Sequence, residues 1–315
     1  MRLVSRLTTE FALMNLRLSL RLLPGRLETS IVAQALLRGA LPHLVGTHGP
    51  ELPTATPLIG SVGSIARSFD RSPETMRRHV QVLVTEGFFV VEPGGVRLAP
   101  TSEAGSRILE YLRGVHDNML WLVEELDSWG LVTRKMANAP GITISNPVAH
   151  GAHTQAIPPL ALILRAALDL RLLGFDTFKG VSSWTSLAVW NTLSAVSVRH
   201  ITTNRQLCSL YRQRSTPDTL RRPISVRALS GVSGLPYATI RRHLADLELA
   251  GRVGRKGNGY VMLTGQLMTS DIERRVVAYV SNALDRVDTL VAKAIDPAAI
   301  PSMYIGARPV LVPVR

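Results

Sequence analysis

The sequence predicts a mainly α-helical protein with small β-hairpins, arranged as two similar halves in one chain. Three observations lead to this fold class. Most of the chain has helical periodicity, two glycine-containing turns are flanked by short apolar runs, and one residue pattern occurs twice. The 315 residues are enough for two or three domains, and a content of 46% hydrophobic and 19% charged residues is typical of a folded chain.

The repeated pattern is the strongest indication of the internal organisation. The segment TMRRHV at residues 75–80 returns as TIRRHL at 239–244, an offset of 164 positions, and the match continues on both sides without a gap. Residues 18–24 resemble 168–174 at an offset of 150, which places an insertion of 14 residues in the second copy between its first helices and its repeated motif. We therefore expect a first repeat, a linker, a second repeat and a C-terminal tail, over residues 10–139, 140–157, 158–299 and 300–315.

Each repeat has the same predicted order: two apolar helices, a short helix, a turn, a longer helix, a β-hairpin and a long amphipathic helix. Ser72 and Pro73 begin the first longer helix as an N-cap and a first-turn proline, and Gly87 and Gly251 end the two longer helices. In the first repeat the expected ranges are 11–23, 30–44, 63–69, 73–86, 88–98 and 102–126. In the second they are 160–173, 183–198, 225–231, 236–250, 252–263 and 270–293.

Helix, turn, helix and hairpin is the order of a winged helix. Residues 64–101 and 228–264 resemble the bacterial winged helix-turn-helix DNA-binding regulators. The resemblance consists of a short helix with a small residue, Ala66 or Ser230, then a threonine, an apolar residue, arginines, a leucine and a helix-ending glycine. It covers about a quarter of the chain and implies the fold and DNA binding, without selecting one family. Those regulators usually carry one unit and dimerise, so two units in one chain predict an intramolecular pseudo-dimer.

The charge distribution favours a polyanionic partner. The net charge is +13; residues 1–150 hold 15 Lys and Arg against 13 Asp and Glu, whereas residues 151–315 hold 21 against 10. The second half, at +11 against +2, is therefore expected to supply most of the non-specific attraction to nucleic acid. Charge alone leaves an anionic membrane surface, or a soluble protein that is merely basic, as alternatives.

The longer helix of each repeat is expected to present an arginine-bearing face to DNA. Met76, Val80 and Leu83 share one face of the first of these helices, and Arg78 lies on the opposite face with Arg77 beside it. An exposed guanidinium suits guanine in the major groove. The predicted DNA-contacting residues are Ser72, Glu74, Thr75, Arg77, Arg78, Gln81 and Arg97 in the first repeat, and Tyr237, Thr239, Arg241, Arg242, Arg252, Arg255 and Lys256 in the second.

These residues have different expected roles. Thr75, Tyr237 and Thr239, near helix N-termini, are placed for phosphates. In the hairpin of the second repeat the basic side chains suit the minor groove or phosphates, whereas the first hairpin offers only one arginine beside Glu92. His79 and His243 lie next to the apolar stripe, so we expect them to pack or cap rather than to read bases.

Other chemistry has weaker support in the sequence. No nucleophile, paired-carboxylate or phosphate-loop motif is present, so we expect neither an enzyme nor a cofactor. His150 and His153 have a metal-ligand spacing, but no carboxylate or thiolate is near them in the sequence, and we expect no metal site. Cys208 is the single cysteine; burial or a redox role is open for it. Trp184 and Trp190 belong either to the core or to an effector pocket.

The sequence contains no uncharged apolar stretch of about 18 residues and no convincing signal peptide, which predicts a cytoplasmic, nucleoid-associated protein without a membrane partner. Its most apolar segment, residues 160–173, is interrupted by Arg165, Asp169 and Arg171. The expected function is a regulator of transcription that binds double-stranded DNA at an asymmetric operator of two half-sites. The alternatives are a plasmid-type replication initiator, which also joins two winged helices, and an architectural or chromosome-segregation protein that uses them for protein contacts. A small-molecule effector and further self-association stay open.

Overall fold

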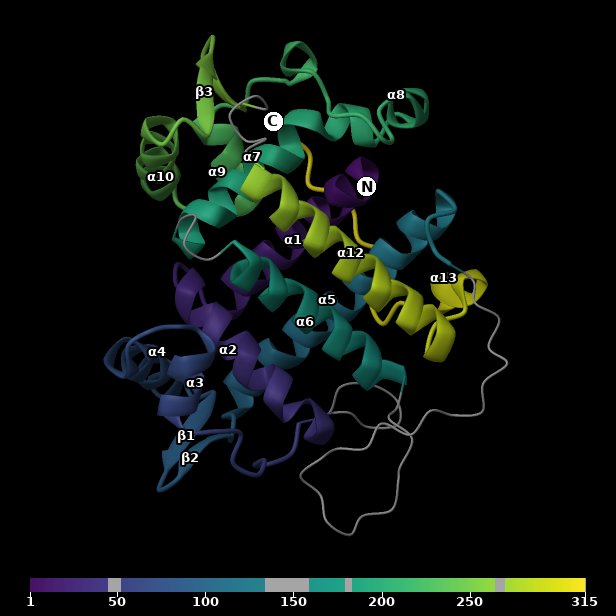
Figure 1. The fold of residues 1–315 in the computed structure, drawn as a ribbon. Helices are drawn as coiled ribbons and strands as arrows, with labels where there is room; N and C mark the ends of the chain where they lie inside the picture. Colours follow the sequence, from purple (N-terminus) through teal and green to yellow (C-terminus); the bar gives the residue numbers. More distant parts are fainter. Residues whose placement is uncertain (45–51, 134–158, 179–182, 264–269, 315) are drawn as a thin grey trace.

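The computed structural model describes residues 1–44, 52–133, 159–178, 183–263 and 270–314. These residues form a mainly helical protein with two small antiparallel β-hairpins, which confirms the predicted fold class at this level (Figure 1). The predicted linker, residues 140–157, lies outside the described residues.

We call the elements from α1 to α5 the first half and those from α6 to α12 the second half. The first half consists of α1 (Arg2–Leu22), α2 (Leu27–Ala40), η1 (Leu41–His43), α3 (Val62–Ser68), α4 (Pro73–Thr85), β1 (Phe89–Glu92), β2 (Gly95–Leu98) and α5 (Ser102–Ser128). The second half consists of α6 (Pro159–Thr177), α7 (Trp184–Thr202), α8 (Arg205–Leu210), η2 (Asp218–Leu220), α9 (Val226–Ser233), α10 (Tyr237–Leu249), β3 (Val253–Lys256), β4 (Gly259–Met262) and α12 (Ser270–Lys293). The chain ends with η3 (Pro297–Ala299), α13 (Ile300–Met303) and an extended segment.

The two hairpins have the same register. Phe89 pairs with Leu98 in the first hairpin, and Val253 pairs with Met262 in the second, each 164 positions later. Each hairpin also receives one isolated bridge from the residues that precede the short helix, Gly60 to Val96 in the first half and Ile224 to Tyr260 in the second. α4 and α10 follow the same offset at both ends. The repeat in the sequence is therefore also a repeat of hydrogen bonding.

Left-handed backbone positions also recur. The turn between the short and the longer helix contains Asp70 at φ 53° in the first half and Gly234 at φ 80° in the second. Gly87 and Gly251, at φ 73° and 69°, follow α4 and α10 as the sequence predicts. A Cβ atom on Gly87 would lie 2.8 Å from Thr101 Cγ2, so both the backbone angle and the space require glycine here.

The halves are packed through each other rather than side by side. α1 contacts α5 of its own half and α7 of the second half, and α6 correspondingly contacts α12 of its own half and α2 of the first. α5 lies against α6, and α12 lies against α1 (Figure 1). Each contact therefore has a counterpart when the halves are exchanged. One cluster of buried apolar side chains runs through both halves.

Buried polar contacts join the halves at fixed points. Glu10 on α1, whose side chain is 1% exposed, accepts hydrogen bonds from Arg199 Nε and Nη2 on α7 at 2.7 and 2.6 Å. Asp169 on α6 accepts from Arg38 on α2 and, at 3.0 Å, from Arg286 Nη1 on α12. The charges that interrupt the apolar segment of α6 therefore include interface residues.

Some elements differ from the sequence-based expectation. α1 begins at Arg2 rather than at residue 11, and Leu3 and Leu7 in its added turns are buried. α8 and η2 were not expected; they lie in the longer connection of the second half, where Cys208 is fully buried. Burial raises the pKa of the Cys208 thiol, which makes this cysteine a core residue rather than a reactive thiolate.

We predict that the buried ion pair between the halves is needed for stability. Glu10→Ala leaves the Arg199 guanidinium buried without its anion, and should lower the free energy of unfolding by about 3–5 kcal/mol. Glu110→Ala is the control, because Glu110 is 67% exposed and lies 3.8 Å from Arg21, and it should cost at most about 1 kcal/mol. Urea denaturation measures both. Equal losses in the two variants would contradict the assignment.

Candidate nucleic-acid interface

The longer helices α4 and α10 each bury one face and expose the other. Met76, Val80 and Leu83 of α4 are at most 1% exposed, and the corresponding apolar residues of α10 are also buried. α4 packs against α2, α2 against α7, and α7 against α10. This row of four helices brings α4 and α10 to the same side of the molecule, at the left in Figure 1, with the two hairpins at opposite ends of that side.

The exposed face of α4 carries an ion-pair cluster. Glu74 Oε2 accepts a hydrogen bond from Arg77 Nη1 at 2.7 Å, and Glu74 Oε1 accepts from Arg78 Nε at 3.3 Å. The hydrogen bond from Arg77 holds the pKa of Glu74 below its usual value. The Arg78 side chain is nevertheless 79% exposed, and Gln81 is exposed beside it. The charge of these two arginines is therefore partly neutralised by a side chain of the same helix.

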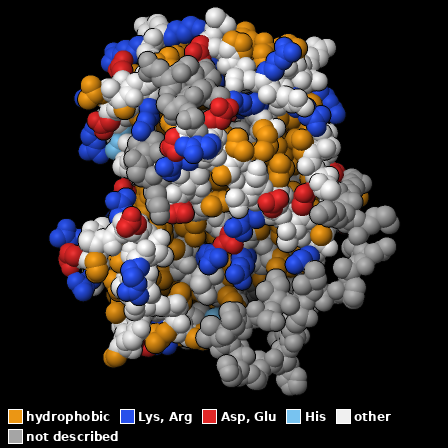
Figure 2. Space-filling view, in the orientation of Figure 1, with side chains coloured by type: hydrophobic (Ala, Val, Ile, Leu, Met, Phe, Trp, Pro, Cys, Tyr) orange, Lys and Arg blue, Asp and Glu red, His pale blue; other side chains and the backbone are white. Residues whose placement is uncertain are grey.

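The exposed face of α10 lacks such a carboxylate. Ala238 occupies the position of Glu74, and Ala245 that of Gln81. Arg241 and Arg242 are exposed, and neither forms an ion pair with any described residue. Figure 2 shows Lys and Arg side chains at the left edge of the molecule near both longer helices, with acidic side chains among them near α4. α10 therefore presents the stronger uncompensated positive charge.

The N-termini of the two helices are capped differently. Ser72 Oγ accepts from the Thr75 amide at 3.2 Å, and the two hydroxyls lie 2.8 Å apart, which confirms the predicted N-cap of α4. Pro236 precedes α10 and offers no side-chain cap. The first amides of α10 are thus free for another acceptor, beside the exposed Tyr237 and the half-buried Thr239.

The two hairpins differ in chemistry at equivalent positions. In the first, Arg97 Nη2 lies 2.6 Å from Glu92 Oε1, and Val90 and Val91 are exposed. In the second, Arg255 stands at the position of Val91 and Lys256 at that of Glu92. The first hairpin is consequently apolar and internally neutralised, a feature that sequence analysis did not identify.

The second hairpin is basic but not wholly free. Arg255 Nε donates to Glu248 of α10 at 3.1 Å, and its guanidinium lies 5.3 Å from the Tyr260 ring centre. Lys256 is exposed at the tip, while Arg252 is half-buried and burial lowers its pKa. Of the three basic residues expected here, Lys256 is thus the one most accessible to a partner.

Further arginines stand near this side that the sequence analysis missed. Arg67 on α3 and Arg227 on α9 are exposed, and Arg71 in the turn before α4 is exposed with its guanidinium 5.0 Å from the Trp184 ring centre. Trp184 belongs to α7, so Arg71 also joins the halves. Their position on the short helices or in the turn would have been the signal, since these segments precede the longer helices directly.

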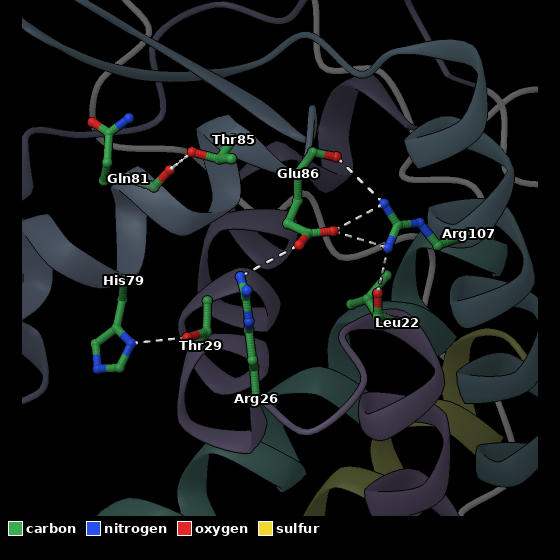
Figure 3. Close-up of polar contacts among 8 residues, drawn as sticks. All are labelled: Leu22, Arg26, Thr29, His79, Gln81, Thr85, Glu86 and Arg107. Atoms are coloured by element: carbon green, nitrogen blue, oxygen red, sulfur yellow. Dashed lines mark hydrogen bonds and ion pairs between the residues drawn. The ribbon is translucent and has the colours of Figure 1, made fainter.

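The histidines of α4 and α10 make equivalent contacts inside the molecule. His79 Nδ1 lies 3.0 Å from Thr29 Oγ1 on α2, and His243 Nδ1 lies 2.8 Å from Ser186 Oγ on α7. Figure 3 shows His79 directed towards Thr29, whereas the Gln81 side chain extends away from these contacts. The expectation that both histidines pack rather than read bases is confirmed by these bonds.

The C-terminal end of α4 is anchored by a second cluster, also drawn in Figure 3. The Glu86 carboxylate lies 3.3 Å from Arg26 Nη1 and 3.3 Å from Arg107 Nη1, and Arg107 also donates to the Leu22 carbonyl at 3.4 Å. α4 is thereby connected to the segment between α1 and α2 and to α5. The exposed face of α4 is therefore presented by a helix held at both ends.

Comparisons with known proteins add no family assignment: no family model, no curated protein and no solved structure matches this chain. No helix in the described part of the chain is long and apolar enough to cross a membrane. The residues with coordinates also contain no group of three or more His, Cys, Asp or Glu side chains arranged to hold a metal ion. His150 and His153 lie outside the described residues.

We predict that His79 and His243 make stability depend on pH. Burial lowers the pKa of both, and for His243 it outweighs the Asp246 carboxylate 3.8 Å from Nδ1. The unfolded chain, with pKa values near 6.5, binds protons more readily, so the free energy of unfolding should fall as the pH decreases below about 6.5.

Chemical denaturation between about pH 7 and pH 5 measures this effect. The double variant His79→Gln, His243→Gln should have a flatter dependence on pH over that range, because two groups that must be neutral in the folded state are gone. His43→Gln, which replaces an exposed histidine, should keep the parent slope. A double variant with an unchanged slope would refute the prediction.

Proposed function

We propose that this chain is a regulator of transcription that binds double-stranded DNA, and that two winged-helix units of one polypeptide act as an intramolecular pseudo-dimer. The observation that carries the proposal is the recurrence of helix, turn, helix and hairpin with one register in both halves. In each unit the second helix exposes an arginine pair at equivalent positions. A helix of this kind, followed by a hairpin, suits insertion into the major groove with the hairpin beside it.

The arrangement of the two units supports simultaneous binding. α4 and α10 lie on one side of the molecule, and both are fixed to a shared core through α2 and α7. A pair of recognition helices on one face can contact two half-sites about one helical turn apart, roughly 10–10.5 base pairs. Neither helix needs a second chain for this.

The proposal is tested by locating where the intact protein binds in its own genome. Cross-linking followed by sequencing of the bound fragments should recover sites upstream of genes, and purified protein should protect the same sites in footprinting. Clustered repeats at a replication origin would favour an initiator instead. Failure to bind duplex DNA at low salt would reject DNA binding and favour a protein-contact role.

We predict that Arg78→Ala and Arg242→Ala each weaken binding to the selected site by about 1–3 kcal/mol, because each removes a bidentate contact to guanine. Arg242→Ala should also reduce the salt dependence, by up to about 0.9 in the slope of log K against log salt, if its guanidinium lies near phosphate. Arg78→Ala should reduce that slope less, because Glu74 already pairs with Arg78. Fluorescence anisotropy at several salt concentrations measures both quantities.

The variants must be made in the full chain, since the halves share one core and separate halves would expose it. Arg113→Ala is the matched control, because it removes an exposed arginine of α5, outside both helix–hairpin units. It should leave affinity and slope unchanged. Unaltered affinity in both Arg78→Ala and Arg242→Ala would remove α4 and α10 from the interface.

We further predict an asymmetric operator. Glu74 can accept from cytosine N4 and Gln81 can pair with adenine, whereas Ala238 and Ala245 at the equivalent positions offer only methyl contacts to thymine. The half-sites should share a guanine element and differ beside it. Selection from a random DNA library, followed by footprinting, gives the preferred sequence.

A matched variant tests the origin of the asymmetry. Ala238→Glu with Ala245→Gln gives α10 the outer residues of α4, and should shift the selected site towards a palindrome. The parent chain should select no palindrome. A perfect palindrome, or a single half-site, recovered with the parent protein would show that the two helices do not read separate sequences.

A further inference from the structure

A cavity lies where the two halves meet, away from the exposed faces of α4 and α10. It is bordered by α1 of the first half and by α6, α7, α12 and β4 of the second, and has a volume of about 170 Å³. An apolar cavity of roughly 150 Å³ is enough to hold benzene. This space therefore accommodates one small ring with a substituent.

One part of the wall is aromatic. Phe178 contacts Trp190 edge to face at 6.0 Å between ring centres, and lies 6.4 Å from Tyr279. Phe175 adjoins them on α6, and Leu187 of α7 extends the apolar surface. Flat apolar side chains at these angles leave a slot in which a planar ring can stack or make edge contacts.

Another part of the wall is strongly cationic. Five arginines line the cavity, and Glu273 is the only acidic residue among the described lining residues. Glu273 is itself 3.0 Å from Arg2, so it is already paired. The lining arginines are Arg2, Arg6, Arg171, Arg214 and Arg221.

Arg171 is a buried cation without a carboxylate partner among the described residues. It is 7% exposed, and donates to Gln34 Oε1, the Ala12 carbonyl and Ser19 Oγ at 3.2, 2.9 and 3.2 Å. Burial lowers its pKa to about 10, so it remains positively charged near neutral pH. A buried charge that has neutral partners only is costly, and a bound anion would offset that cost.

Two further side chains have donors to spare. Trp190 is 7% exposed, and its Nε1 has no hydrogen-bond partner. Arg6 donates through Nη2 to the Tyr211 carbonyl at 3.0 Å, but its Nε and Nη1 are buried without a partner. Unsatisfied buried donors are rare in folded proteins, and several around one cavity indicate a missing acceptor.

We propose that this cavity binds a small aromatic carboxylate, whose ring lies among Phe175, Phe178 and Trp190 and whose oxygens accept hydrogen bonds from Arg6 and Arg171. A carboxylate has two acceptor oxygens and matches a guanidinium in bidentate geometry. The aromatic wall excludes a strongly hydrated inorganic anion as the preferred ligand, because such an anion would leave that wall without a contact.

The cavity is connected to the second DNA-facing unit through α7. Leu187 and Trp190 of α7 line the cavity, while Ser186 in the same turn bonds His243 of α10 at 2.8 Å. Ser194, one turn further, donates to Met262 Sδ of β4 at 2.6 Å. Ligand binding should therefore alter the placement of α10 and its hairpin; this second step rests on the proposed function.

Binding is tested on the full chain by isothermal titration calorimetry with benzoate and phenylacetate, and with benzamide as the neutral counterpart. The acids should bind saturably at one site per chain, and benzamide should bind at least about tenfold more weakly, because it has no charge to pair with the arginines. Arg6→Gln and Arg171→Gln should each weaken benzoate binding at least about tenfold.

Controls separate a lost site from a lost fold. Circular dichroism checks each variant; if Arg171→Gln does not fold, Arg6→Gln, at a less buried position, still decides. Arg113→Gln should bind benzoate like the parent. No saturable binding of either acid up to about 10 mM, near the weak end of specific affinity, or equal binding of benzamide, would overturn the proposed site.

The coupling is measured separately, as the affinity for the selected duplex with and without benzoate. A changed DNA affinity in the parent chain, and none in Arg6→Gln, supports transmission through α7. Benzoate binding with unchanged DNA affinity overturns the coupling but not the site. Benzoate binding by a chain that binds no DNA overturns the proposed function alone.

Discussion

The position of α1 and α6 between the halves is the constraint on which the rest of the structure depends. Each of these helices contacts the long C-terminal helix of its own half and the second helix of the other half. Glu10 and Arg199 pair at one of these crossings, and Asp169 pairs with Arg38 at the other. A buried ion pair is favourable only with good geometry, so each pair disfavours sliding or rotation of one half against the other.

This constraint reaches the surface through α2 and α7. The outer helices α4 and α10 rest on α2 and α7, and each forms a histidine–hydroxyl bond to them, between His79 and Thr29 and between His243 and Ser186. A hydrogen bond to a half-buried ring defines the rotation of the helix that carries it as well as its position. The exposed arginine faces therefore follow from contacts made on the opposite side of the same helices.

The order of elements was predictable because local signals and the repeat agreed: turn glycines, a serine cap and apolar spacing occur twice at one offset. The distribution of the insertion was not. Thr29 and Ser186 are 157 positions apart, midway between the offsets 150 and 164, so the extra residues fall in equal parts before and after the N-terminal turn of α7 rather than wholly after it. Ion pairs within α4, the cavity and the buried state of Arg171 depend on side-chain directions and long-range packing, which periodicity does not contain.

The two candidate DNA-facing units differ where they are most exposed. Leu58, Val90 and Val91 of the first unit correspond to Arg222, Gly254 and Arg255 of the second. A homodimer presents the same chemistry twice and has two equivalent orientations on its site. A single chain with unlike units would have one orientation, because the basic unit and the partly neutralised unit would prefer different half-sites. Under the proposed function, the cavity beside α7 then always lies nearer to the same half-site, so a bound carboxylate would act on one end of the operator rather than on both.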